Sequence, residues 1–152
     1  HVIGAKAVAF NEAMSTQYSD YMKRVKSNAK IMSELLIEKG YDIISGGTDN
    51  HCMLIDLRSK NINGKDAEEI LGKVDITVNK NMVPFDTESP FVTSGIRIGT
   101  AAITSRGIHS EMIPQIVSMI DRSLMNSTNE KSLSDIKSEI HETMSPLPLF
   151  QW

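Results

Sequence analysis

One permanent positive charge, Arg97, lies inside a short apolar segment with the sequence G-I-R-I-G, residues 95–99. A guanidinium group can hold a carboxylate with two parallel hydrogen bonds, which fixes the orientation of the bound group. The flanking Gly95 and Gly99 would let a ligand or another backbone approach closely. Two interpretations remain open: an ion pair with an acidic residue of the protein itself, or a binding site for the carboxylate of a ligand.

The neighbouring segment, residues 79–91, combines amide side chains with proline and phenylalanine. The amides of Asn79 and Asn81 could pair with the edge of a planar polar heterocycle, and apolar rings could pack against its faces. The segment supplies these rings from Pro84, Phe85, Pro90 and Phe91. The alternative is a long surface loop in which the prolines only limit the conformational entropy.

The other residues that could do chemistry are scattered. His1, His51, His109 and His141 make no short-spaced pair with each other or with Cys52, so we predict no metal site. We expect Cys52 to be a small core residue. The G-G-T-D turn at residues 46–49 is too short a signal for phosphate binding. No nucleophile, P-loop or dinucleotide motif occurs.

Composition narrows the class of protein. The chain has 152 residues, with 16 basic and 19 acidic side chains and a net charge of −3. No basic stripe is present to bind nucleic acid, and no apolar run is long enough to cross a membrane. A single cysteine fits a reducing compartment. We therefore expect a cytoplasmic protein without nucleic-acid or membrane partners.

The elements that must position Arg97 follow from the hydrophobic periodicity. The pattern predicts two helices, two strands, a helix, two strands and two helices, in that order. The predicted strands are 41–45, 52–57, 76–78 and 95–99, and the predicted helices are 2–14, 16–39, 61–72, 113–124 and 133–144. Residues 79–91 are expected to form a loop, and the strand at 52–57 is apolar enough to be covered on both faces. The fold class is α/β, with a mixed or antiparallel sheet of three or four strands covered by helices.

The first predicted helix differs from the others because it is apolar on all sides. Such a helix is expected to be buried on more than one side. It need not belong to the core of the remaining chain. The opening H-V-I-G also begins with neither Met nor a capping residue, which favours a piece of a longer protein.

Five ordered motifs give the chain a specific resemblance. They are G-G-T-D-N-H, G-K-D-A-E, I-T-V-N-K-N, S-P-F-V-T-S-G-I-R-I-G-T and T-S-R-G. In this order and spacing they closely resemble serine hydroxymethyltransferase, over nearly the whole chain and corresponding to about its C-terminal third. The resemblance implies a small C-terminal domain of a fold-type-I enzyme that uses pyridoxal 5′-phosphate (PLP). Residues 1–15 would be the end of the large PLP domain, and residues 16–152 the small α/β domain led by a long linking helix.

The resemblance also implies an activity and site residues. The family interconverts serine plus tetrahydrofolate with glycine plus 5,10-methylenetetrahydrofolate, as a homodimer. Arg97 matches the arginine that binds the carboxylate of the amino-acid substrate. Asn81, together with Ser89, Pro90 and Phe91, matches residues that contact the folate.

The family's Schiff-base lysine and its other PLP-binding groups match no position in this chain, and Lys80 does not match that lysine. We therefore expect no catalytic, cofactor-binding or metal-binding residue here, and no activity from this chain alone. The alternative hypothesis is a free-standing α/β binding or interaction module without catalysis.

Overall fold

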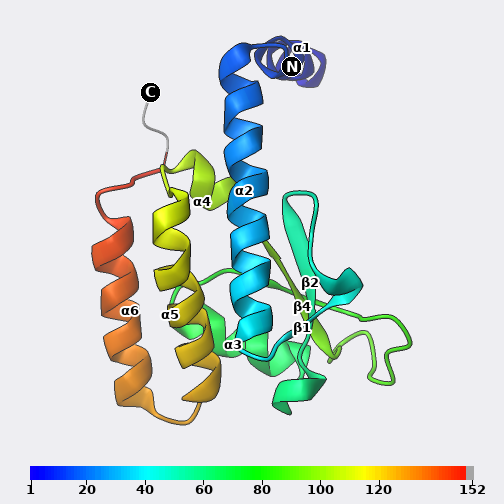
Figure 1. Ribbon diagram of the computed structural model, residues 1–152, viewed down its shortest axis with the longest axis vertical. Coiled ribbons are helices and arrows are strands. Elements are labelled where there is room, and N and C mark those ends of the chain that lie inside the picture. Colours follow the sequence, from blue (N-terminus) through cyan, green and yellow to red (C-terminus); the bar gives the residue numbers. More distant parts are fainter. Residues whose placement is uncertain (150–152) are drawn as a thin grey trace.

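The computed structural model describes residues 1–149, in which helices cover one face of a four-stranded sheet (Figure 1). The helices are α1 (Val2–Ala13), α2 (Thr16–Glu38), α3 (Gly64–Lys73), α4 (Ala101–Ser105), α5 (Ile113–Met125) and α6 (Glu130–Met144). The strands are β1 (Asp42–Ile43), β2 (Cys52–Asp56), β3 (Asn79–Asn81) and β4 (Gly95–Gly99). The predicted α/β class is confirmed. The last three residues, 150–152, lie outside the described part of the chain.

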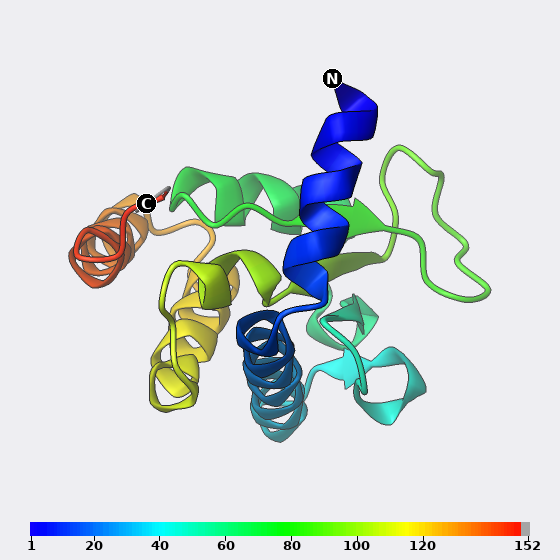
Figure 2. The same ribbon diagram turned by 90° about the horizontal axis from the view of Figure 1, so that it is seen from above.

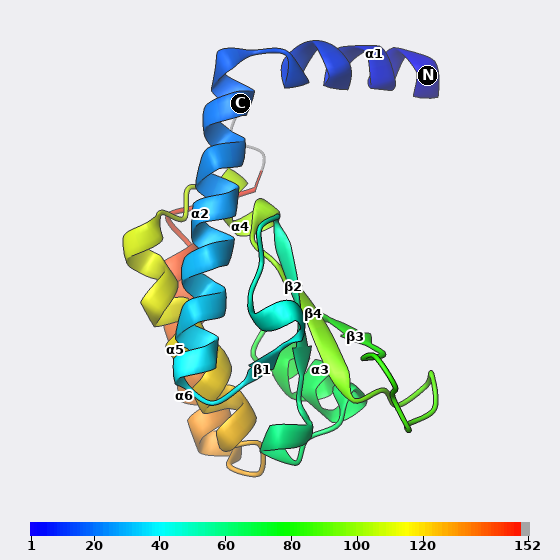
Figure 3. The ribbon, with the colours of Figure 1, turned by 45° about the vertical axis from the view of Figure 1, so that its right-hand side comes forward.

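The sheet is entirely antiparallel, with the order β1-β2-β4-β3. One face carries Met53 and Ile55 of β2 beside Ile96 and Ile98 of β4, and all four side chains are buried in the core. This face is covered by α2, α3 and α5, while α6 packs outside α5 through a second apolar cluster (Figure 3). No α-helix of residues 1–149 covers the other face of the sheet.

Local sequence signals explain where the helices begin and end. The Ser15 side chain accepts a hydrogen bond from the backbone N–H of Tyr18 at 3.1 Å, and Asn63 does the same for Asp66 at 2.8 Å. These are N-caps, which satisfy backbone donors that have no partner within the helix. Gly40, with φ of +81°, follows the end of α2 in the left-handed conformation that glycine adopts without strain.

The prediction of a strand at residues 76–78 is wrong. Ile76 and Val78 are half-buried against the core, but the segment that pairs with β4 is β3, Asn79–Asn81. The apolar residues there pack against the core without strand pairing, and β3 begins in the segment that was expected to be a loop. The expectation that β2 is covered on both faces holds only in part: on the face opposite the core, Asp56 is buried but Cys52 and Leu54 are only half-buried.

The first helix is present as predicted, but its expected burial is not found in this chain. None of the residues of α1 is buried, and Ile3 and Phe10 are 85% and 69% exposed. Figure 3 shows why: α1 extends sideways from the end of α2, away from the sheet and the other helices. The core therefore belongs to the chain that follows α1.

Candidate functional site

Arg97 lies in the centre of the uncovered face of the sheet. Its neighbours Ile96 and Ile98 point into the core, so the alternation of side chains along β4 places Arg97 on the opposite face, where it is exposed. In the ladder it is paired with Leu54 of β2 and Asn79 of β3. Two neighbouring strands therefore fix the backbone from which the guanidinium extends.

No acidic residue of residues 1–149 forms an ion pair with Arg97, and the guanidinium makes no hydrogen bond within this part of the chain. Arg58, in contrast to Arg97, has an acidic partner. Its Nε donates two hydrogen bonds of 3.0 Å to the carboxylate of Asp56, which is buried on β2. The hydrogen bonds from Arg58 lower the pKa of the Asp56 carboxyl. Of the two interpretations left open by the sequence, the internal ion pair is not found.

A cavity of about 790 Å³ lies beside Arg97. One wall is α2, with Lys30 and Glu34, and the others are β2 and the turn at residues 44–50. The sequence analysis predicts no binding role for α2 or for the G-G-T-D turn. Only the tertiary structure brings them next to β4. The cavity places an unpaired cation at a concave surface, which is where small ligands bind.

Asn81 ends β3 on the same face as Arg97. It is paired with Gly95, two residues from Arg97 along β4, so the two side chains are diagonal neighbours. The Nδ2 of Asn81 donates to the Met82 carbonyl at 2.7 Å. Its side-chain carbonyl makes no hydrogen bond within the described chain, which leaves an acceptor available on this face.

The three other candidate folate residues lie on the loop at residues 82–94, which extends away from the sheet (Figure 2). The Ser89 carbonyl accepts the N–H groups of Val92 and Thr93 at 3.0 and 2.9 Å, and this turn presents Pro90 and Phe91 to solvent. Phe91 is 83% exposed. Neither Asn81 nor any of these three residues lines the cavity beside Arg97. The strand pairing brings Asn81 next to Arg97, whereas Ser89, Pro90 and Phe91 lie on the loop outside the sheet.

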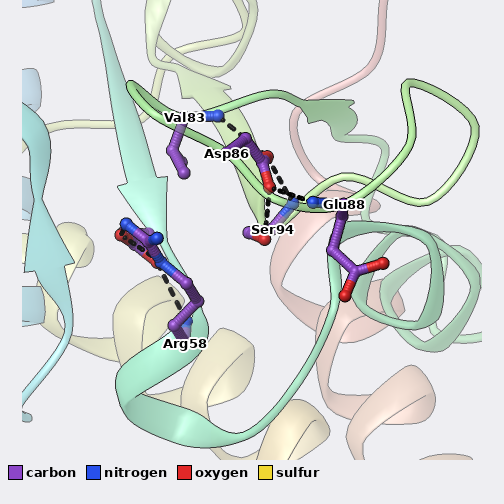
Figure 4. A network of polar contacts seen from close by, with 6 residues as sticks. Arg58, Val83, Asp86, Glu88 and Ser94 are labelled. Atoms are coloured by element: carbon purple, nitrogen blue, oxygen red, sulfur yellow. Dashed lines mark hydrogen bonds and ion pairs between the residues drawn. The ribbon is translucent and has the colours of Figure 1, made fainter.

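The loop is organised around a residue that the sequence did not single out, Asp86 (Figure 4). Its Oδ2 accepts the backbone N–H groups of Val83 at 3.1 Å and Ser94 at 2.9 Å. Its Oδ1 accepts the N–H of Glu88 at 2.9 Å and the hydroxyl of Ser94 at 2.7 Å. Burial alone would raise the pKa of Asp86, but these hydrogen bonds outweigh it, so the pKa lies well below its ordinary value.

The described residues do not fit a PLP anchor. A lysine that holds this group needs an enclosed position next to the substrate, and no lysine of residues 1–149 is buried. Lys80, the lysine beside the loop, is instead paired with Glu68 of α3 at 2.9 Å. Within the same residues, no three His, Cys, Asp or Glu side chains are grouped so as to hold a metal ion. None of the helices described has the length and apolarity needed to span a bilayer.

Comparison with known families agrees with the resemblance carried by the five motifs. A family model described as serine hydroxymethyltransferase matches residues 1–120. The match includes α1, the cavity wall formed by α2, the whole sheet with Arg97, and the loop held by Asp86. Because it covers well over half of the 152 residues, the chain belongs to the serine hydroxymethyltransferase family.

Proposed function

We propose that this chain is the C-terminal part of an enzyme that interconverts serine plus tetrahydrofolate with glycine plus 5,10-methylenetetrahydrofolate. The observation that carries the proposal is Arg97, an exposed guanidinium with no partner in the described chain, at the edge of a cavity. Membership of the family supports a transferase of this type. The unpaired cation supports a role in binding an anionic substrate.

Arg97 would hold the carboxylate of serine or glycine. The pairing of β4 with β2 would hold the backbone of Arg97 in place before the substrate binds. A guanidinium forms two parallel hydrogen bonds with a carboxylate, so it fixes the direction of the rest of the amino acid. Holding the substrate in one orientation lowers the entropic part of the barrier to reaction.

The folate would lie over the neighbouring edge of the sheet and the loop. Asn81 offers its side-chain carbonyl to a ring N–H, next to the amino acid held at Arg97. Ser89 would add a polar contact, while Pro90 and Phe91 would pack against the rings. A large exposed phenylalanine on an extended loop is consistent with a partner that covers it.

The residues that anchor PLP would belong to a segment of the complete protein before His1, since none of the described lysines fits that role. We further propose that residues 1–15 end the large domain, that residues 16–152 form the small domain, and that the complete enzyme is a cytoplasmic homodimer. This chain alone would then be inactive, because it supplies contacts to the substrates and no group for the chemical step.

The test replaces Arg97 with Lys in the complete protein that carries this chain. The variant keeps the charge but loses the guanidinium group that can form two parallel hydrogen bonds with a carboxylate. Glycine binding measured by calorimetry should therefore weaken by about tenfold or more. PLP content, measured from its absorbance, should not change. Arg58→Lys is the matched control, because Arg58 pairs with Asp56 and does not line the cavity. Normal glycine affinity in Arg97→Lys would show that the proposed role is wrong.

A further inference from the structure

The loop at residues 82–94 consists of two halves that are joined by a single side chain. The first half, 82–88, contains a turn in which Asp86 N–H donates to the Val83 carbonyl at 3.1 Å. The second half, 89–94, contains the turn closed by the Ser89 carbonyl. Within the described chain, the hydrogen bonds between the halves are those from the N–H and hydroxyl of Ser94, and both end on the Asp86 carboxylate.

The second half has an anchor of its own. The N–H groups of Gly64 and Lys65, at the beginning of α3, donate to the carbonyls of Thr93 and Val92, each at 2.9 Å. Gly64 is also packed so closely that a Cβ atom there would lie 2.0 Å from Oγ1 of Thr93. The end of the loop is therefore fixed to the protein body independently of Asp86.

The first half makes no such hydrogen bonds to α3 within the described residues; the buried side chain of Val83 fixes its beginning, but the turn that follows is under strain. Phe85 has φ of 57°, a conformation that is unfavourable for a bulky side chain, and its side chain is 98% exposed. Packing of the side chain therefore does not offset the strain in its backbone. Such a conformation persists only where the surrounding structure holds the backbone in place. Asp86 supplies that constraint, because its carboxylate accepts the N–H of Val83 on one side of Phe85 and of Glu88 on the other.

We propose that Asp86 is a positioning residue for folate binding: its carboxylate fixes residues 82–88 against Ser94, and so holds the loop between Asn81 and Phe91 in the form that receives the folate. This inference rests on the proposed function. Asp86 itself need not touch the ligand, since the four hydrogen bonds that its carboxylate accepts within the described chain all come from the loop. A loop that is already ordered loses less entropy when the ligand binds.

The experiment uses the complete protein and measures the dissociation constant of tetrahydrofolate by calorimetry, with glycine present at saturation. Asp86→Asn replaces an acceptor-only carboxylate with an amide whose NH₂ group cannot accept from the loop. Folate binding should weaken by about tenfold or more, and glycine binding in the absence of folate should stay as in the wild type. Ser94→Ala keeps the carboxylate but removes one of the two bonds between the halves, so it should give a smaller loss of the same kind.

Glu88→Gln is the matched control. Its substitution removes a carboxylate from the same half of the loop, but within the described residues Glu88 contacts Asp86 only through its backbone N–H. Its folate affinity should equal that of the wild type. A loss equal to that of Asp86→Asn would show that loop charge, rather than the bonds of Asp86, sets the affinity.

The outcomes separate this inference from the proposed function. If the wild type binds glycine but no tetrahydrofolate, the folate part of the proposed function is wrong, and the inference fails with it. If the wild type binds tetrahydrofolate and Asp86→Asn binds it equally well, only the inference is overturned. Equal losses of glycine and folate binding in Asp86→Asn would also overturn it, because they would indicate general damage to the fold.

Discussion

Gly95 lies so close to Ile55 across the β2–β4 pair that a Cβ atom on Gly95 would stand 2.5 Å from the Ile55 carbonyl oxygen. The same atom would lie 2.7 Å from Cγ1 of Val83, at the start of the loop. The glycine at this end of the G-I-R-I-G segment therefore lets the loop and β2 approach β4. The groups that approach Gly95 in this chain are therefore the protein's own backbone and the side chain of Val83.

Gly95→Ala should consequently destabilise the protein. A side chain forced into a closed space costs about 1–3 kcal/mol, and here one of the contacts is backbone that cannot rotate away. Gly99→Ala is the control, since its Cβ would meet the His51 carbonyl oxygen at an ordinary 3.4 Å. We expect Gly99→Ala to stay within about 0.5 kcal/mol of the wild type in urea unfolding. Equal stability of the two variants would contradict the packing described for Gly95.

The absence of a partner for Arg97 can be tested through stability alone. Because Arg97 makes no ion pair or hydrogen bond within residues 1–149, Arg97→Ala should leave the free energy of unfolding within about 0.5 kcal/mol of the wild type. Arg58→Ala should be clearly less stable, because it leaves the buried Asp56 carboxylate without its partner. A large loss of stability in Arg97→Ala would mean that Arg97 has an internal partner after all.

Strain at Phe85 predicts a stabilising substitution. Glycine adopts positive φ without steric cost, and the exposed Phe85 side chain contributes almost no packing, so Phe85→Gly should raise stability by up to about 1 kcal/mol. Thr93 also has positive φ, at 61°, but it is buried and its hydroxyl donates to the Gly95 carbonyl. Thr93→Gly should therefore lower the melting temperature while Phe85→Gly raises it. A fall in both would show that Phe85 is not strained.

The low pKa of Asp86 predicts how its contribution varies with pH. A carboxyl whose pKa is lower in the folded protein than in the unfolded chain, where it is about 3.9, stabilises the fold above that pH. The stabilisation is lost as the pH falls through the lowered folded pKa. The difference in stability between wild type and Asp86→Asn should thus be largest near neutral pH and shrink only below about pH 4. Urea unfolding at several pH values measures this, and a constant difference down to pH 2 would contradict it.

Removal of α1 should not weaken the remaining chain. No residue of α1 is buried, and α2 has its own N-cap in Ser15. A chain starting at Ser15 should therefore melt at the same temperature as the chain of 152 residues. It should also self-associate less at high concentration, since the exposed side chains of Ile3 and Phe10 are removed. A markedly lower melting temperature would mean that α1 packs on the core.

Local sequence patterns were sufficient for much of this protein. The stripes of apolar residues predicted α2, α5 and α6, and the segment G-I-R-I-G was correctly expected to be the strand β4. These predictions hold because helix periodicity, caps and glycine positions act over a few residues. The five motifs also indicated the family, which the match over residues 1–120 confirmed.

The tertiary structure decided what depends on contacts between distant residues. Whether residues 76–78 or β3 form a strand depends on which of them pairs with β4, and the apolar pattern of Ile76 and Val78 cannot show this. The partners of Asp86 are likewise invisible in the sequence, because its role depends on a backbone that folds back to Ser94. The sequence by itself determined that a lone arginine lies within an apolar strand. Only the packing of α2, α3 and α5 on one face of the sheet left Arg97 on the other, where no carboxylate of residues 1–149 reaches it.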